Sequence, residues 1–261
     1  MITLKTKEDI AILREGGQRH AHIMAALVAM VRPGVTTKEL DDAAAKMIAE
    51  GGDKAAFLGY KPRGAKRAYP ASLCVSVNDE VVHGIPNENN RKLVNGDVVS
   101  IDLGLVHRGL VTDMAVTVPV GNVSPDVAGL LRDTERALMA GIDAAKGGKR
   151  VTDVSIAIER VGRGARAGKG YGIVEELSGH GVGYKVHEDP FVPNYVRGNQ
   201  KGEIMQPGLV IAIEPMFNLG TKDVTLDADG YTIRTADGSV SAHFEHTIVI
   251  TKSGAEILTM L

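Results

Sequence analysis

Apolar residues recur at helical spacing in four stretches of the chain, and each stretch is predicted to form an amphipathic helix. The first two begin with capping boxes, Thr6 with Asp9 and Thr36 with Glu39, in which the side chain of each residue satisfies the backbone amide of the other. Glycine or proline residues end the helical patterns. The expected helices cover about residues 7–31, 36–50, 125–145 and 151–162.

Two β-rich runs, Asp97–Leu105 and Gly109–Val118, predict a β-hairpin. If its two-residue loop is His107-Arg108, Asp102 lies opposite Asp113 on one face, with Cβ atoms ~5 Å apart. A loop longer by one residue would change this register. Two carboxylates at that distance repel each other and lose hydration unless a cation lies between them, and a metal ion is the simplest such cation. The alternative is that one Asp is a turn or edge residue.

The chain contains an internal repeat. The segment Gly96–Asp102 aligns with Gly208–Glu214, and each copy follows two helices and ends on an acidic residue. We therefore expect an α+β fold in a single domain, residues 1–261, built from two halves of about 1–120 and 121–261. A pseudo-twofold axis would pool their strands into one sheet with the helices outside. Acidic residues at equivalent strand positions would then converge at the centre.

Composition narrows the class of protein. Charged residues are 24% and hydrophobic residues 44% of the 261, as in an ordinary globular protein, and the net charge of −2 argues against a specific nucleic acid as partner. Cys74 is the one cysteine, which excludes an internal disulfide framework and fits a reducing cytoplasm. The amino terminus is charged too early for a signal peptide, and the longest apolar run, Ile23–Val31, is too short to span a membrane. The basic loop 61–67 could contact phosphate, although a solvated loop is the simpler interpretation.

Five polar residues in strand contexts form the candidate site: Asp102, Asp113, His180, Glu214 and Glu245. Four carboxylates and one imidazole are too acidic to bury together without cations. Bridging carboxylates could hold two divalent ions ~3.5–4 Å apart, the geometry of hydrolytic dimetal sites. Oxygen-rich ligation suits Mn, Fe or Co, and Zn remains open. Taken singly, each residue could be interpreted as purely structural: an acidic turn residue, an exposed strand residue or a core histidine.

The set of motifs resembles the type I methionine aminopeptidases of the pita-bread metallopeptidases, and the likeness covers nearly the whole chain. It implies a mainly antiparallel curved sheet with helices on its outer face. Five ordered motifs carry the resemblance: Val82–Pro86, Ile101-Asp102 with Asp113, Ser178–Gly183 with His187, Ile213–Met216, and Ser241–Thr247.

The resemblance also assigns the metal ligands. It implies that Asp102 chelates one ion, that His180 and Glu214 hold the second, and that Asp113 and Glu245 bridge the two. A hydroxide bridging the ions would attack the carbonyl of the first peptide bond, with Glu214 as general base.

The substrate side of the site is likewise implied by the resemblance. His83 and His187 would contact the scissile peptide outside the metals and stabilise the tetrahedral intermediate. The activity would be removal of the N-terminal methionine from nascent proteins and peptides with a small second residue, by a monomer in the cytoplasm. A transient ribosome contact is left open. The residues implied in substrate binding are Phe57, Tyr60, Tyr69, Cys74, His83, Val186, His187 and Tyr231.

The chain departs from the family pattern at two pocket positions and in one loop, and the spacing of two histidines is unusual for a strand. Val186 and Tyr231 stand where the family often has phenylalanine and tryptophan, so the pocket could be wider, and the loop 61–68 is longer than in many relatives. His180 and His187 are an odd number of residues apart, which puts them on opposite faces of a regular strand. Either a bulge re-aims one of them or His187 lies beyond the strand end.

Other functions remain open at this stage. A prolidase or Xaa-Pro aminopeptidase would use the same five ligands, but such relatives usually carry an additional amino-terminal domain. A type II enzyme would have a helical insertion between His187 and Glu214. A non-catalytic binding protein on this fold would lose metal ligands, whereas all five are present here.

Overall fold

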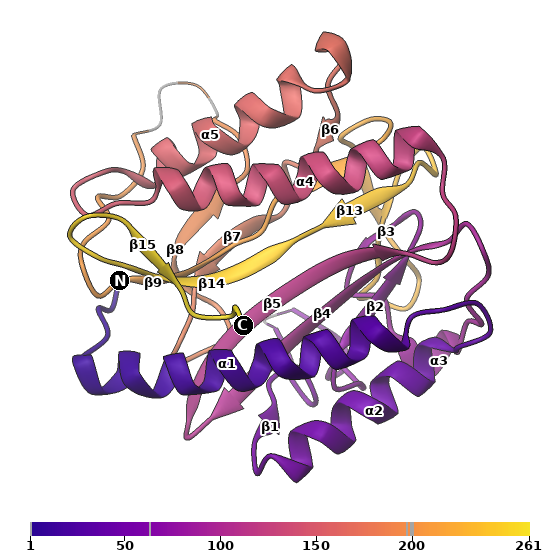
Figure 1. The fold of residues 1–261 in the computed structure, drawn as a ribbon, viewed down its shortest axis with the longest axis horizontal. Coiled ribbons are helices and arrows are strands. Elements are labelled where there is room, and N and C mark those ends of the chain that lie inside the picture. The colour runs from indigo at the N-terminus through magenta and orange to yellow at the C-terminus, as the bar shows by residue number, and fades with distance from the viewer. Residues whose placement is uncertain (1, 63, 197, 199–200) are drawn as a thin grey trace.

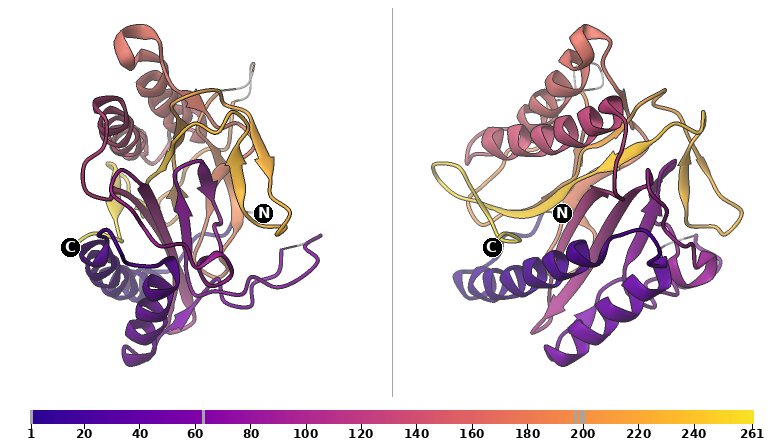
Figure 2. Two further views of the ribbon diagram at one scale, coloured as in Figure 1. Left: turned by 90° about the vertical axis from the view of Figure 1, so that its right-hand side faces the viewer. Right: turned by 45° about the vertical axis from the view of Figure 1, so that its right-hand side comes forward.

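The computed structural model describes residues 2–62, 64–196, 198 and 201–261. Four long helices lie on one side of a large β-sheet, and the hairpin of residues 224–235 lies on the other side (Figures 1 and 2). The helical elements are α1 (Lys7–Met30), α2 (Thr37–Glu50), α3 (Pro86–Asn89), α4 (Pro125–Ala144), α5 (Val151–Gly164) and the 3₁₀ turn η1 (Arg166–Gly168).

Among the described residues, the large sheet has nine strands, and all their pairings are antiparallel. Its main path is β1-β4-β5-β14-β9-β7-β8, with β2 beside β4 and β15 beside β14. The strands are β1 (Lys54–Ala55), β2 (Cys74–Val77), β4 (Val98–His107), β5 (Leu110–Pro119), β7 (Ser178–Gly181), β8 (Glu188–Pro193), β9 (Val210–Ile213), β14 (Glu245–Ile250) and β15 (Ala255–Ile257).

Two small sheets complete the fold. One has the order β13-β10-β6 and the other β11-β12-β3. The strands are β3 (Glu80–Val82), β6 (Gly172–Ile173), β10 (Met216–Asn218), β11 (Val224–Leu226), β12 (Ile233–Thr235) and β13 (Ser241–His243). The extended segment from residue 241 to 250 is not one strand, because it breaks at Phe244 into β13 and β14.

The sequence repeat corresponds to a repeat in the sheet. Strands β4 and β5 of the first half match β9 and β14 of the second, and β5 pairs with β14 where the halves meet. Gly96 and Gly208 both have left-handed backbone, with φ of 96° and 93°, where glycine is favoured. The expected α+β fold, with pooled strands and outer helices, is confirmed.

The capping boxes and apolar faces that predict the helices are present in the structure. Thr6 and Thr36 accept from the amides of Asp9 and Glu39, and both capping boxes are complete. One apolar core packs α1 and α2 on the first half of the sheet, and another packs α4 and α5 on the second. Within the described part of the chain, no helix is long and apolar enough to cross a membrane.

The register of the β4–β5 hairpin differs from the expected one. Its turn is Arg108-Gly109, with φ of 48° and 86°, as a type I′ turn requires at its two central positions. Asp102 therefore pairs with Ala115, and Asp113 pairs with Gly104. The shift preserves the side-chain alternation, so both carboxylates remain on one face as diagonal neighbours rather than direct partners.

Candidate active site

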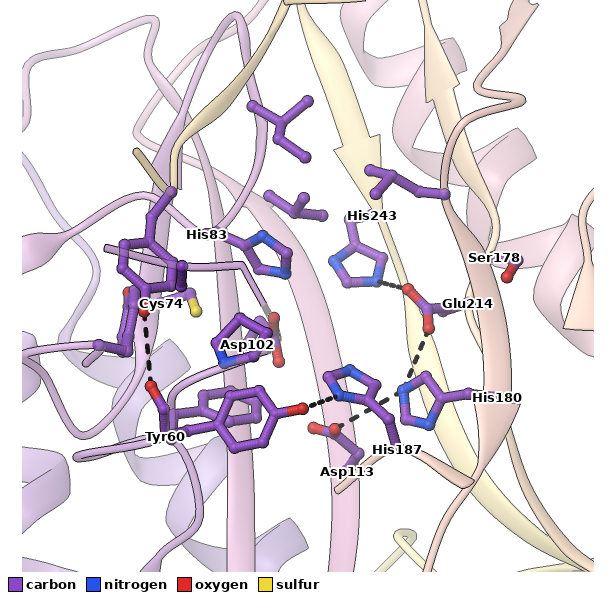
Figure 3. Close-up of a pocket in the computed structure, with 18 of the residues that line it drawn as sticks. Tyr60, Cys74, His83, Asp102, Asp113, Ser178, His180, His187, Glu214 and His243 are labelled. Atoms are coloured by element: carbon purple, nitrogen blue, oxygen red, sulfur yellow. Dashed lines mark hydrogen bonds and ion pairs between the residues drawn. The ribbon is translucent and has the colours of Figure 1, made fainter. Parts of the chain in front are cut away.

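Neighbouring strands bring the five expected ligands together. Asp102 lies on β4, Asp113 on β5 and His180 on β7, while Glu245 is the first residue of β14 and Glu214 directly follows β9. The strand order β4-β5-β14-β9-β7 places these elements side by side. Figure 3 shows the labelled members of the set converging on one cavity.

His180 lies where the pairing of β7 with β8 is irregular. The register shifts between His180 and Gly181, and a Cβ at Gly181 would lie 2.2 Å from the carbonyl oxygen of Asp189, so only glycine fits. His187 precedes β8, beyond the end of β7. The rings of His180 and His187 nevertheless approach to 4.4 Å between centroids. Both expected solutions to their odd spacing, a local bulge and a position beyond the strand, are present.

One group of three side chains has the spacing of a metal site. Asp113, His180 and Glu245 each offer a ligand atom, and these atoms all lie within 4.8 Å of one another. Nε2 of His180 is 4.0 Å from Oδ2 of Asp113 and 3.4 Å from Oε1 of Glu214. Asp102 lies on the same face of the sheet at the diagonal position to Asp113.

The four carboxylates of the candidate site disfavour the ionised form of one another. Burial and the charges of Asp102 and Glu214 raise the pKa of Asp113 well above its ordinary value. Burial also raises the pKa of Asp102 to about 7, and burial together with Asp113 raises the pKa of Glu245. Burial acts on Glu214 in the same direction, but contacts with His243 and His180 outweigh it and lower its pKa. A cation would stabilise the ionised form of all these groups.

The donor set fits a divalent cation. Oδ1 of Asp102 and Oε1 of Glu245 are buried without a hydrogen-bond partner among the described residues. Nδ1 of His180 lies 3.0 Å from the carbonyl oxygen of Gly181, so Nδ1–H donates and Nε2 presents its lone pair to the carboxylates. Metal-binding histidines are oriented in this way by their second nitrogen. Oxygen ligands with one imidazole are typical of Mn, Fe, Co or Zn sites.

Without metal, the free energy of unfolding is expected to fall as the pH rises through about 7. The pKa of Asp102 is raised to about 7 in the folded state, so the folded chain holds its proton to a higher pH than the unfolded chain, and the raised pKa values of Asp113 and Glu245 act in the same direction. Each group that stays protonated only in the folded state contributes a loss of about 1.4 kcal/mol per pH unit. Urea unfolding with a chelator and with saturating Mn²⁺ would measure the difference.

Histidines do not explain such a slope. Their lowered pKa values reduce stability only as the pH falls below about 6.5, the ordinary value for the unfolded chain. In the metal-free protein, Asp113→Asn should flatten the slope and raise the stability at pH 8. Identical slopes with chelator and with metal would contradict a cation site.

Two further histidines border the metal centre. His187 is accessible from the cavity, and its Nδ1 lies 2.8 Å from Oη of Tyr60 (Figure 3). Its surroundings exclude enough water to lower its pKa to about 4, and His180 adds to this effect. Burial likewise lowers the pKa of His83, which has left-handed backbone with φ of 59°. Both rings are therefore neutral near pH 7.

His243 is a site residue that the sequence analysis missed. It is 1% exposed, and its Nε2 lies 3.5 Å from Oε2 of Glu214 and 3.9 Å from Oε2 of Glu245. The sequence offered one indication that His243 belongs to the site: it lies two residues before Glu245, and alternate positions of a strand share a face. His243 and Glu245 belong to different strands, so the alternation alone was weak evidence.

All five candidate ligands line a cavity of about 430 Å³. Aromatic and apolar side chains form a recess beside these ligands, and Tyr69 and Tyr231 meet there edge to face with centroids 5.2 Å apart. Val186 is not among the lining residues. It packs in the adjoining apolar cluster with Phe57 and Tyr60. The expected substrate-binding residues that do line the cavity are Phe57, Tyr60, Tyr69, Cys74, His83, His187 and Tyr231.

The basic loop closes part of this cavity. Pro62, Gly64 and Ala65 contribute to the lining. The guanidinium of Arg67 forms an ion pair with Glu88. The backbone carbonyl of Arg67 accepts a 2.6 Å hydrogen bond from Oη of Tyr231. The interpretation of this loop as simply solvated is therefore incomplete. Arg63 lies outside the described residues.

Comparisons with known proteins agree with this geometry. A methionine aminopeptidase from Aquifex aeolicus (strain VF5) is 44% identical over 261 residues, with 100% of this chain and 99% of that relative covered. The crystal structure of a methionine aminopeptidase from Thermotoga maritima superposes with a TM-score of 0.92 at 38% identity over the full length of both chains. A prolidase from Pyrococcus furiosus has a TM-score of 0.74 at 22% identity, covers 99% of this chain and 65% of its own, and so shares the fold alone. Residues 11–252 match the sequence model of metallopeptidase family M24, and the chain belongs to that family.

Proposed function

We propose that this metallopeptidase removes the N-terminal methionine from polypeptides whose second residue is small. One observation carries the proposal: a single cavity contains both a cation-binding carboxylate cluster and an apolar aromatic recess. The recess would take the methionine side chain, which would place the first peptide bond at the cluster. The full-length likeness to methionine aminopeptidases supports the same substrate.

Two divalent ions, when bound by the five acidic and imidazole ligands, would polarise the scissile carbonyl and acidify water. Glu214 is suited to act as the general base beside them. Despite its burial, its pKa is lowered by His243 and His180, so it is ionised near pH 7 and accepts a proton. His243 would hold the carboxylate of Glu214 in place from the opposite side, through its contact with Oε2.

His187 is suited to donate a hydrogen bond to the carbonyl oxygen as negative charge develops there. A neutral imidazole can donate from Nε2 only if Nδ1 is the acceptor in its other contact. Tyr60 supplies that contact: burial raises the pKa of Tyr60, so its hydroxyl stays protonated and donates to Nδ1 of His187. His83 lines the same cavity and would orient the peptide from the side of β3.

Replacing Tyr60 with phenylalanine is expected to lower kcat by about 5- to 10-fold, the equivalent of one neutral hydrogen bond of about 1 kcal/mol. The ring that lines the recess is kept, so KM for a methionyl peptide should change little. Tyr231→Phe is the matched control, since the Tyr231 hydroxyl donates to the carbonyl of Arg67 rather than to a histidine. An equal fall of kcat in both variants would contradict a specific role for Tyr60.

The proposed function is tested with the purified protein, Mn²⁺ or Co²⁺, and a set of short peptides. Met-Ala-Ser should be cleaved after its first residue, and a peptide with a large second residue should resist. Norleucine should replace methionine in part, because apolar pockets separate side chains by only ~1–3 kcal/mol per methylene. Preferential cleavage of Xaa-Pro peptides with Xaa other than methionine would favour a prolidase instead. Tight binding without turnover would favour a non-catalytic protein.

The natural substrates would be the N-termini of nascent polypeptides. We infer that the enzyme acts in the cytoplasm as a monomer, and that any contact with the ribosome is transient. Leu226 and Ile233 of the β11–β12 hairpin line the cavity, where they would contact residues of a polypeptide beyond the first.

A further inference from the structure

The N-terminal strap, residues 2–6, lies against the loop that presents His187. The amide of Lys5 donates a 2.8 Å hydrogen bond to the carbonyl of Gly208, just before β9. Its side chain passes beside Gly183, where a Cβ would lie 2.3 Å from Cε of Lys5. Figure 1 shows the strap running from beside β9 into α1. The strap therefore reaches the residues 182–188, which we call the histidine loop.

Lys5 ends in a buried ion pair. Its Nζ lies 2.7 Å from Oε2 of Glu188, and the two side chains are 1% and 10% exposed. The ammonium also lies 4.4 Å from the centroid of the Tyr184 ring. A charge at this depth is stable only beside its partner, so the pair holds the strap and the histidine loop in one arrangement.

The second oxygen of Glu188 holds the backbone of the histidine loop. Oε1 accepts from the amides of Tyr184 and Lys185, at 2.6 and 2.9 Å. The hydroxyl of Tyr184 in turn donates to Oδ2 of Asp9 in the first turn of α1, at 2.6 Å. Glu188 thus links the strap to the loop at the residue directly after His187.

We propose that Lys5 and Glu188 are positioning residues for His187. The inference rests on the proposed function, in which Nε2 of His187 contacts the scissile carbonyl. Residues 183–187 form bends rather than a strand, and Gly183 has φ of 136°. The position of His187 therefore depends on side-chain contacts, and an error of about 1 Å is enough to reduce catalysis severely.

The first test replaces Lys5 with methionine, which keeps most of the buried stem and removes the charge. We expect kcat for Met-Ala-Ser to fall about 10- to 100-fold, the usual effect of losing an outer partner of a reacting group, with KM and metal content unchanged. Lys5→Arg should restore most of the activity. Arg14→Met is the matched control: it breaks an exposed 2.6 Å ion pair between α1 and Glu256 of β15 and should leave kcat unchanged.

The second test combines Lys5→Met with His187→Ala. If Lys5 acts through His187, the double variant should be no slower than His187→Ala alone. The same fold-loss in both backgrounds would overturn the proposal. If Lys5→Met does not fold, Lys5→Met with Glu188→Gln removes both buried charges and keeps an acceptor for the loop amides. This variant should show the same fall in kcat, and wild-type kcat would overturn the proposal.

A third measurement is independent of activity. Hydrogen exchange at the amides of Tyr184 and Lys185 should become faster in Lys5→Met than in Arg14→Met. Unchanged exchange at these two amides would overturn the positioning role alone. Failure of the wild-type protein to cleave Met-Ala-Ser would instead reject the proposed function.

Discussion

Asp113→Ala is expected to abolish peptide cleavage and to remove bound metal. Asp113, His180 and Glu245 offer ligand atoms within 4.8 Å of one another, so the loss of Asp113 leaves any bound cation short of a carboxylate. Because the metal centre would supply most of the rate enhancement, turnover should fall by ~10⁴-fold or more. Metal analysis of the purified variant and steady-state kinetics with Met-Ala-Ser would measure both effects.

Loss of folding is not expected to explain this result. The pKa of Asp113 is raised by burial and by neighbouring carboxylates, so removing it relieves repulsion in the metal-free protein. Metal-free Asp113→Ala should therefore unfold at a urea concentration no lower than the metal-free wild type. Asp143→Ala, which removes an exposed carboxylate from α4, is the control and should keep full activity and metal content. Full activity in Asp113→Ala would reject the metal mechanism.

His187→Ala is expected to keep its metal and to lose kcat by ~10²–10³-fold, about 2.7–4 kcal/mol of transition-state stabilisation. The side chain lies beside the carboxylate cluster, but its Nδ1 is engaged by Tyr60 and its ring lines the cavity. It is thus placed to contact a substrate carbonyl instead of a cation.

His180→Ala is the informative comparison. Nδ1 of His180 is bound to a backbone carbonyl and Nε2 faces the carboxylates of Asp113 and Glu214, so this variant should lose metal affinity. Metal content and kcat for the two variants together separate a ligand from a substrate contact. If His187→Ala loses metal while His180→Ala keeps it, the two roles are reversed.

Local patterns predicted the fold well because each has a direct physical cause. The capping boxes at Thr6 and Thr36 begin α1 and α2, and the repeat around Gly96 and Gly208 marks equivalent positions before β4 and β9. The predicted register of the β4–β5 hairpin was wrong, because the turn lies one residue further along the chain than expected. Gly109 supports positive φ at the second turn position, and this requirement moved the turn to Arg108-Gly109.

The parts of the site that the sequence could not predict depend on contacts between distant segments. Tyr60 and His187 are 127 residues apart, and their hydrogen bond follows from the fold rather than from any spacing. His243 contacts Glu214 from a different strand, and Val186 packs behind the cavity where a pocket residue was expected. Five ordered motifs predicted the metal ligands and the class of reaction. They could not predict the hydrogen-bond partner of the second ring nitrogen of each histidine.

The junction between the two halves has a consequence for how this protein could have arisen. Strand β5 meets β14 there, with Glu245 opposite Ala115, and Asp113 and Glu245 contribute to the candidate cation site from opposite sides of the junction. Neither half alone contains the group of three ligands. If the halves descend from one duplicated ancestor, an isolated copy would have lacked this centre, and a pair of copies would have been needed to form it. A cation bound at the junction would also hold the two halves together, because its ligands come from both of them.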